Sequence, residues 1–215
     1  MDGFDQITSI IALTMGVAWA SGINLYAAIL MLGLMGLNGT VQLPADLQIL
    51  AHPWVISAAG LMYAVEFVTD KIPGLDTLWD SLHTFIRIPA GAILAVGAVG
   101  QIDPAVTVAA AILGGTVSAG THAVKAGSRA MVNTSPEPLS NWTLSISEDL
   151  VVIAGIWAAV QHPWLFLVFF GLFILIAIWL LPRIWRGCKY IFQRLKKLTG
   201  HRRHRPSSDS SMVSR

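Results

Sequence analysis

The sequence predicts an all-α, polytopic integral membrane protein, and three observations indicate this class. Of 215 residues, 54% are hydrophobic and only 12% are charged, whereas a soluble domain carries about 25% charged residues. The mean hydropathy is strongly positive. Two apolar segments, 48–68 and 163–182, approach the ~20 residues needed to cross the hydrocarbon core of a bilayer. A soluble protein with a large core is the disfavoured alternative.

The charges are divided sharply along the chain. Residues 1–182 contain eleven acids and four bases, whereas residues 183–215 contain ten bases and one acid. Basic residues near the end of a membrane span stay on the cytoplasmic side. We therefore predict a membrane domain over 1–188 and a basic cytoplasmic tail over 189–215. The tail should be disordered after residue 200 and could rest on anionic lipid.

The remaining apolar segments are shorter, which is typical of broken or re-entrant helices. They cover residues 7–20, 25–37, 88–101, 104–121 and 150–161.

Two related halves are indicated, one over about 6–88 and one over about 104–186. The run ITSIIALTMGVAWASGIN is similar to AVTVAAAILGGTVSAGTH, and the tripeptide His-Pro-Trp precedes an apolar run in both halves, at 52–54 and at 162–164. Duplication explains this pattern better than chance. Parallel and inverted repeats both remain open.

Each half contains a small polar segment where we expect a helix to break. The first contains Ser21, Gly22 and Asn24, and the second contains Gly120 and His122. Helix N-termini at such breaks present free N–H groups, and two breaks that meet near the midplane would form a transporter-like binding site. Close helix packing at small residues is an equally favoured explanation.

An acidic segment lies between apolar runs in the first half. Glu66 and Asp70 are four residues apart, and a helix break is expected at Pro73–Gly74. Beyond it, one helix face would carry four ionisable residues, Asp76, Asp80, His83 and Arg87. This second helix should be amphipathic and lie near the interface. The segment could form a proton or cation relay or an ion-pair lock, or the second set could be a solvated face. Its spacing lacks a closed metal-ligand set.

A basic helix face in the second half has few large apolar neighbours. His122, Lys125 and Arg129 lie at positions i, i+3 and i+7. Charged groups within a membrane need partners or a cavity. The candidate partners are two acidic pairs, Glu66 with Asp70 and Glu148 with Asp149, and Arg129 is the expected partner of Glu66. An anion or lipid headgroup is the alternative.

The segment 133–149 contains two prolines, Pro136 and Pro138, which should exclude a helix there. We expect Ser147 to cap the next helix, with Glu148 and Asp149 in its first turn.

Enzymatic chemistry has little support. The sequence contains no Gly-rich phosphate loop, nucleophile elbow or Cys/His metal motif. We expect no enzyme activity, no cofactor, no bound metal and no nucleic-acid partner.

Three segments resemble a known family. They are SGINLYAAILMLGL, EFVTDKIPGLDTLWDSLHTFIRIPAGA and THAVKAGSRAMVNTSPEPLSNWTLSISED. They resemble the bacterial membrane family catalogued as domain of unknown function 4126, and the similarity covers about residues 6–182. The resemblance implies an all-helical protein of the bacterial inner membrane. It implies no substrate, cofactor or catalytic residue.

These patterns favour a small transporter or channel whose pathway lies between the two halves, with an anionic or proton-coupled substrate. Two alternatives stay open. One is a structural or assembly protein with permanently paired buried charges. The other is a flippase-like protein in which Lys125 and Arg129 hold a phospholipid phosphate. The chain could also form a homo-oligomer.

The basic tail generates a prediction about topology. A reporter fused after Arg205 should show activity typical of the cytoplasm, because the ten bases of residues 183–215 resist translocation. Activity typical of the periplasm would contradict this orientation.

Overall fold

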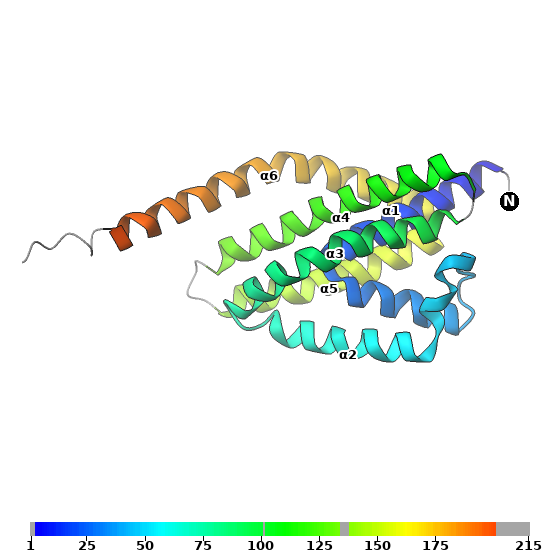
Figure 1. Ribbon diagram of the computed structural model, residues 1–215, viewed down its shortest axis with the longest axis horizontal. Helices are drawn as coiled ribbons and strands as arrows, with labels where there is room; N and C mark the ends of the chain where they lie inside the picture. Colours follow the sequence, from blue (N-terminus) through cyan, green and yellow to red (C-terminus); the bar gives the residue numbers. More distant parts are fainter. Residues whose placement is uncertain (1–2, 101, 134–137, 201–215) are drawn as a thin grey trace, which may run out of the picture.

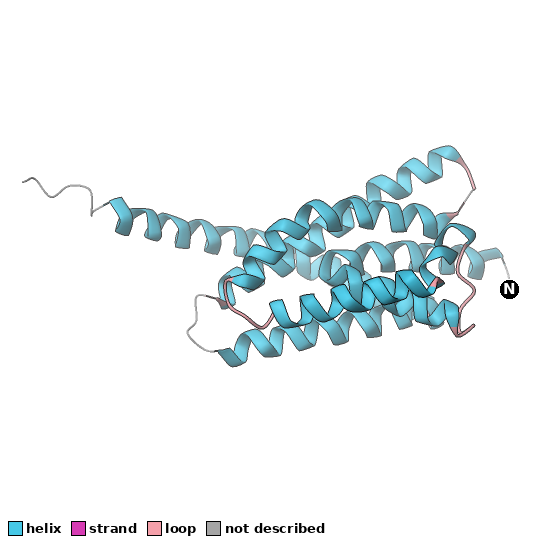
Figure 2. Cartoon of the chain, turned by 60° about the horizontal axis from the view of Figure 1, so that its bottom comes forward, coloured by secondary structure: helices cyan, strands magenta, loops and turns pink. Residues whose placement is uncertain are grey.

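The computed structural model describes residues 3–100, 102–133 and 138–200 of the chain. Figures 1 and 2 show an elongated helical bundle, and the described residues contain no strand. The all-helical prediction is therefore confirmed. The elements are α1 (Gly3–Leu37), η1 (Ala45–Ala51), α2 (Pro53–Thr69), α3 (Leu75–Val99), α4 (Pro104–Val132), α5 (Pro138–Gln161) and α6 (Pro163–Gly200).

The helices have the length and apolar composition of a multi-pass membrane protein. Five of them, α1, α3, α4, α5 and α6, are long and apolar enough to cross a bilayer. The short helix η1 and helix α2 meet at an angle of 66° and together make a sixth candidate span. Helix α3 runs for 25 residues without a break, so the predicted amphipathic helix is the first part of a longer helix that has the length of a span.

Helix α1 folds back on itself at Asn24. This residue has non-helical dihedral angles of φ −145° and ψ 95°. Residues near the start of α1, including Gln6 and Leu13, line the same hollow as Val41 and Pro44, which follow its end. Both ends of α1 therefore lie at the same end of the bundle, as Figure 1 shows.

The polar groups exposed by this fold are satisfied within the protein. Asn24 accepts a hydrogen bond from the N–H of Ala27 at 2.9 Å, so it caps the second half of α1. Its amide nitrogen donates to Asp149 at 2.9 Å. The carbonyl oxygen of Ile23 accepts from the Lys125 ammonium group at 2.9 Å. Broken backbone at membrane depth requires such partners, because lipid offers none.

The second predicted break is wrong. Helix α4 runs without interruption from Pro104 to Val132 and includes Gly120 and His122. The small residues of its centre serve close packing instead. A Cβ atom placed on Gly22 would lie 1.7 Å from Oγ1 of Thr121 and 2.4 Å from the carbonyl oxygen of Ser118. The two polar segments thus meet, although only the first is broken.

Helix α1 lies at the centre of the packing. Trp19 is buried against Gly155 of α5 and makes edge-on contacts with Phe166 and Phe173 of α6. Helix α6 is the outermost candidate span, and its C-terminal part extends beyond the bundle in Figure 1. Residues 201–215 of the predicted tail lie outside the described part of the chain.

The region before Glu148 also differs from the prediction. Pro138 is the first residue of α5, where a missing N–H costs nothing, so residues 139–149 are helical. Ser147 lies inside this helix and donates to the carbonyl of Leu144 at 2.8 Å. It therefore does not cap the helix.

The contact between Gly22 and α4 generates a prediction about stability. Gly22→Ala should lower the free energy of unfolding in detergent by about 1–3 kcal/mol, because the added methyl group collides with backbone and Thr121. Gly120→Ala is the matched control. Its Cβ would meet no atom within 4 Å, and alanine raises helix propensity by up to ~1 kcal/mol. Equal effects of the two substitutions would contradict this packing.

Candidate functional site

A buried ionic network occupies the interior of the bundle where α2, α3, α4 and α5 meet. It comprises five acids and three bases joined by ten contacts of 4 Å or less, and these residues are Glu66, Asp70, Asp76, Asp80, Arg87, Lys125, Arg129 and Glu148. Seven of the eight side chains are at most 3% exposed, and that of Glu148 is 11% exposed. Transferring so many charges out of water costs free energy. Only well-aligned ion pairs and hydrogen bonds can offset most of that cost.

Helical spacing brings the acids of α3 into the network. Asp76, Asp80 and Arg87 lie on one face and are buried, while Leu82 and Phe85 on the opposite face are 58% and 82% exposed. The helix break at Pro73–Gly74 is confirmed, and Gly74 adopts a positive φ of 87° between α2 and α3. The second acidic set is therefore a buried face, so the solvated alternative is wrong.

Lys125 lies at the point where four carboxylates converge. Its Nζ donates to Glu66 Oε1 at 3.0 Å, to Asp70 Oδ2 at 3.2 Å and to the carbonyl of Ile23 at 2.9 Å. Asp80 and Glu148 each have a carboxyl oxygen 3.7 Å from the same nitrogen. All three N–H donors of the ammonium group are thus used by the protein.

Arg129 follows His122 by seven residues and Lys125 by four residues on α4, so the three side chains lie on one helix face. It donates to the carboxylate and the carbonyl of Asp70, both at 2.8 Å, and forms an ion pair with Glu148. Glu66 pairs with Arg87 and Lys125 instead, so the prediction that Arg129 is its partner is wrong. The four-residue spacing explains this register: Glu66 faces Lys125, and Asp70 faces Arg129, one turn further along both α2 and α4.

Arg87 connects the network to the two predicted polar segments. Its guanidinium group donates to Asp80 at 3.2 Å and pairs with Glu66. Its carbonyl oxygen accepts hydrogen bonds from Ser21 at 2.9 Å and Ser118 at 2.8 Å. The packing of α1 on α4 is therefore tied directly to the charged part of α3.

Two histidines lie beside the network. Nδ1 of His122 is 3.3 Å from Nη1 of Arg87, which can only donate, so this contact favours a neutral ring with Nδ1 as the acceptor. Its Nε2 then donates to Thr84 at 2.7 Å. His83 is hydrogen-bonded to Trp79 through Nδ1 and to Tyr26 through Nε2, an arrangement open to both the neutral and the charged ring.

Most sequence-predicted site residues lie in or against this network, and one does not. Asp149 accepts a hydrogen bond from Asn24, which follows Ile23, the residue whose carbonyl bonds to Lys125. A Cβ atom placed on Gly120 would have no neighbour within 4 Å, so this position lies away from the network. Sequence reasoning missed several neutral residues that bond to members of the network or to the two histidines. These are Tyr26 on His83, Thr84 on His122, Asn133 on Asp76 and Asn141 on the carbonyl of Asp70. These residues could have been identified in the sequence as neutral polar residues within or beside apolar segments.

The network contains more acids than bases. Its five carboxylates face three bases, an excess of two negative charges if all groups are ionised. Three of the buried carboxylates each have an oxygen atom without a hydrogen-bond partner, and they are Glu66, Asp70 and Asp80. Such atoms are costly inside a protein, more so inside a membrane.

Neighbouring charges do not remove this excess. Asp149 adds one acid, and Lys71, at the turn after α2, adds one base. Partial burial lowers the pKa of Lys71, while Asp149 and Asp70 act in the opposite direction. If His83 were also charged, six acids would face five bases, which still leaves an excess of one acid. Among the described residues, no group of three or more His, Cys, Asp or Glu side chains has the arrangement to hold a metal ion.

The pairing of Glu66 with Lys125 generates a prediction. Lys125→Gln should lower the free energy of unfolding in detergent by about 3–5 kcal/mol, because it leaves buried carboxylates without their central base. Glu66→Gln should cost less, since the network already contains more acids than bases. The double variant should recover part of the loss, which a double-mutant cycle measures.

A cycle between Lys125 and the exposed Asp46 is the matched control and should be additive. Strict additivity between Glu66 and Lys125 would contradict the pairing.

Comparison with known proteins places this chain in a family. No curated protein and no solved structure matches the chain. A family model described as "Domain of unknown function (DUF4126)" matches residues 11–183, a range that includes every residue of the ionic network. The chain belongs to this family of unknown function, DUF4126.

Proposed function

We propose that this protein is a small proton-coupled membrane transporter in which the buried ionic network carries the protons. The observation behind this proposal is the excess of two carboxylates over bases within an almost solvent-free interior. A fully ionised network would hold uncompensated negative charge at membrane depth, which is costly. Protonated carboxyl groups remove that cost.

Protons fit the network better than a metal cation does. A metal would require carboxyl oxygens that converge on one free point. The point of convergence is occupied by Nζ of Lys125, which lies between 3.0 and 3.7 Å from four carboxylates. A proton needs no such space, and the oxygens of Glu66, Asp70 and Asp80 that lack a hydrogen-bond partner provide places for it.

The break in α1 supports a transport role. Discontinuous helices place half-helix ends at the substrate and ion sites of many transporters. Here, the first half of α1 ends on Lys125, and the second half begins at Asn24 beside Asp149. In a bilayer, α1 would be a re-entrant hairpin whose tip touches the ionic network. Proton movement in the network would then bias the position of the tip.

Internal duplication would supply the two parts that move against each other. In Figure 1, the first half of α1 and helix α4 start at the same end of the bundle, as do α2 and α6. These are the pairs of elements that carry the similar sequences, so their directions support parallel repeats. The orientation with the C-terminus in the cytoplasm of a bacterial cell remains part of this proposal.

One observation favours a purely structural role. The donors of Lys125 and most donors of Arg129 are satisfied by protein atoms, as expected of permanently paired charges. The two functions differ in whether the network exchanges protons with the solvent. A scaffold keeps its protons, whereas a transporter must release and rebind them.

Proton exchange can be tested in proteoliposomes that contain a pH-sensitive dye. Three solute classes would be added outside: an inorganic cation, an organic anion and a primary amine. At least one should change the internal pH faster with the wild-type protein than with protein-free liposomes, because its transport is coupled to protons. Glu66→Gln and Asp80→Asn should remove most of this protein-dependent rate, since each deletes a proton-carrying oxygen.

Asp46→Asn is the matched control, because Asp46 is an exposed acid on η1 outside the network. It should transport at the wild-type rate. The proposal fails if no class of solute distinguishes the wild type from Glu66→Gln, provided that both proteins are folded in the liposomes.

A further inference from the structure

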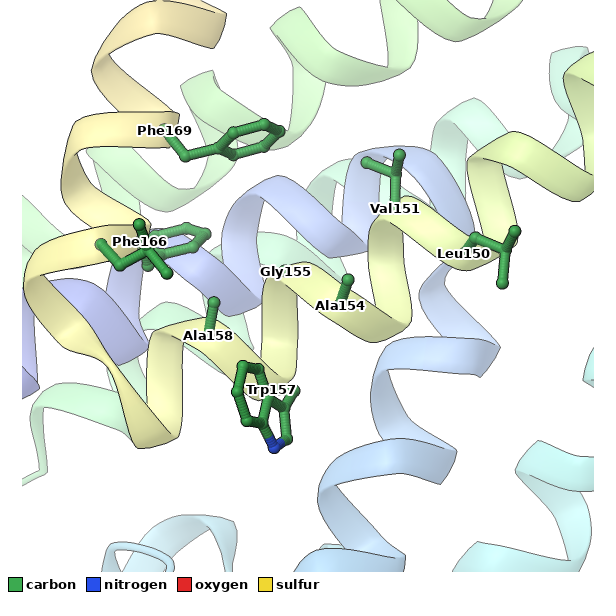
Figure 3. Close-up of a pocket in the computed structure, with 9 residues that line it drawn as sticks. Leu150, Val151, Ala154, Gly155, Trp157, Ala158, Phe166 and Phe169 are labelled. Carbon is green, nitrogen blue, oxygen red and sulfur yellow. The ribbon is translucent and has the colours of Figure 1, made fainter.

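Two adjoining hollows flank helix α5, one between α5 and α6 and the other between α5 and α4. The first, called the apolar groove, has a volume of about 500 Å³ and is lined by side chains that include Val151, Ala154, Ala158, Phe166 and Phe169. Figure 3 shows Phe166 and Phe169 on α6 beside the labelled residues of α5. The aromatic and small side chains leave a lengthwise depression on the outer surface of the bundle.

The second hollow, called the polar portal, lies between α4 and α5, and Ile23 of α1 and Phe173 of α6 complete its lining. It has a volume of about 170 Å³. Four polar residues, Lys125, Ser128, Ser147 and Glu148, line it together with apolar side chains that include Val124, Leu144, Val151 and Phe173. Val151 lines both hollows, so the apolar groove and the polar portal meet at this residue. The portal in turn ends at two members of the ionic network, Lys125 and Glu148.

We propose that these hollows bind a single amphiphilic ligand that has a hydrocarbon chain and a primary ammonium head. The chain lies in the apolar groove, and the head enters the polar portal and bonds to Glu148. The ligand reaches the site sideways from the bilayer. This inference rests on the proposed function for the ligand's role as substrate, but binding is independent of transport.

The shape and polarity of the two hollows carry the first part of the inference. Binding sites for small ligands are typically concave, largely apolar, and supplied with a few polar groups that fix orientation. The groove residues Leu165 and Trp157 are exposed at its edges, so the groove is open to lipid along its length. A ligand with one apolar end and one polar end fits the apolar groove and the adjoining polar portal.

Hydrogen-bonding capacity at the portal selects the chemistry of the head. The three donors of Lys125 are taken by Ile23, Glu66 and Asp70. The hydroxyl groups of Ser128 and Ser147 donate to backbone carbonyls, which leaves their oxygen lone pairs as acceptors. The portal therefore offers acceptors and requires a donor from the ligand.

Charge points to a cation as well. The side chain of Glu148 is the most exposed in the ionic network, at 11%, and the network has an excess of acids. A primary ammonium group supplies both the positive charge and three N–H donors. A phosphate head would meet a carboxylate and find no free donor on Lys125. The sequence-based alternative in which Lys125 and Arg129 hold a phospholipid phosphate is therefore disfavoured.

Photolabelling of the full-length protein in lipid nanodiscs tests this site. The probe is a dodecylamine that carries a photoreactive diazirine on its chain. Labelled peptides identified by mass spectrometry should come from residues 150–158 and 165–173. Unlabelled dodecylamine should compete with the probe, whereas dodecyl phosphate and dodecanol, which have the same chain, should compete at least about tenfold less well.

Three variants separate the head site from the chain site. Glu148→Gln keeps a hydrogen-bonding oxygen for Arg129 but removes the charge, and it should weaken competition by dodecylamine about tenfold. Ala154→Phe fills the groove without touching the ionic network and should abolish labelling there. Ala109→Phe, an exposed position on α4 that lines neither hollow, is the control and should label as the wild type does.

The outcomes distinguish this inference from the proposed function. Labelling that is equal for dodecylamine and dodecyl phosphate, or that survives Ala154→Phe, would overturn the ligand site whatever the proton flux. Specific labelling in a protein that exchanges no protons would leave the site intact and remove its role in coupled transport.

Discussion

The structure depends on the position of one ammonium group. Lys125 lies in the middle of a membrane-type bundle, 2.9–3.7 Å from four carboxylates and one backbone carbonyl. An unpaired charge there would be too costly for so small a protein. Acids must therefore reach it from α2, α3 and α5, and each of these helices has its register fixed by that requirement.

The same requirement explains the break in α1. A continuous helix would keep the carbonyl of Ile23 within its own hydrogen bonds. The break frees that oxygen for Lys125, and Asn24 replaces the lost helical bonds by capping the second half and contacting Asp149. Ser21 and Ser118 then bond to the backbone of Arg87, which anchors the broken helix to the network. Charge pairing and backbone irregularity are thus parts of one arrangement.

The class of fold and most of the charged residues of the site could be predicted from the sequence, because ionisable residues that interrupt apolar segments are visible in the sequence pattern. It predicted faces of helices but not which faces meet. Arg129 and Lys125 are both on the correct face of α4, yet only the register of α4 against α2 decides that Glu66 meets Lys125. The two Gly-containing segments looked alike, but their polar side chains act differently. Asn24 caps a new helix and bonds to Asp149, whereas the hydroxyl groups of Ser118 and Thr121 donate to the carbonyls of Arg87 and Ser118. Gly120 lacks such a partner, so α4 continues through it.

The acid excess gives the network a property that pairing alone does not: under the proposed function, some of its carboxyl groups are protonated while the protein is folded. Infrared spectroscopy of the wild-type protein in lipid at neutral pH measures this directly through the C=O stretch of protonated carboxyl groups. The account predicts such bands, a shift of the bands in heavy water, and loss of intensity in Asp80→Asn or Glu66→Gln but not in Asp46→Asn. A spectrum in which every carboxyl group is ionised would contradict it.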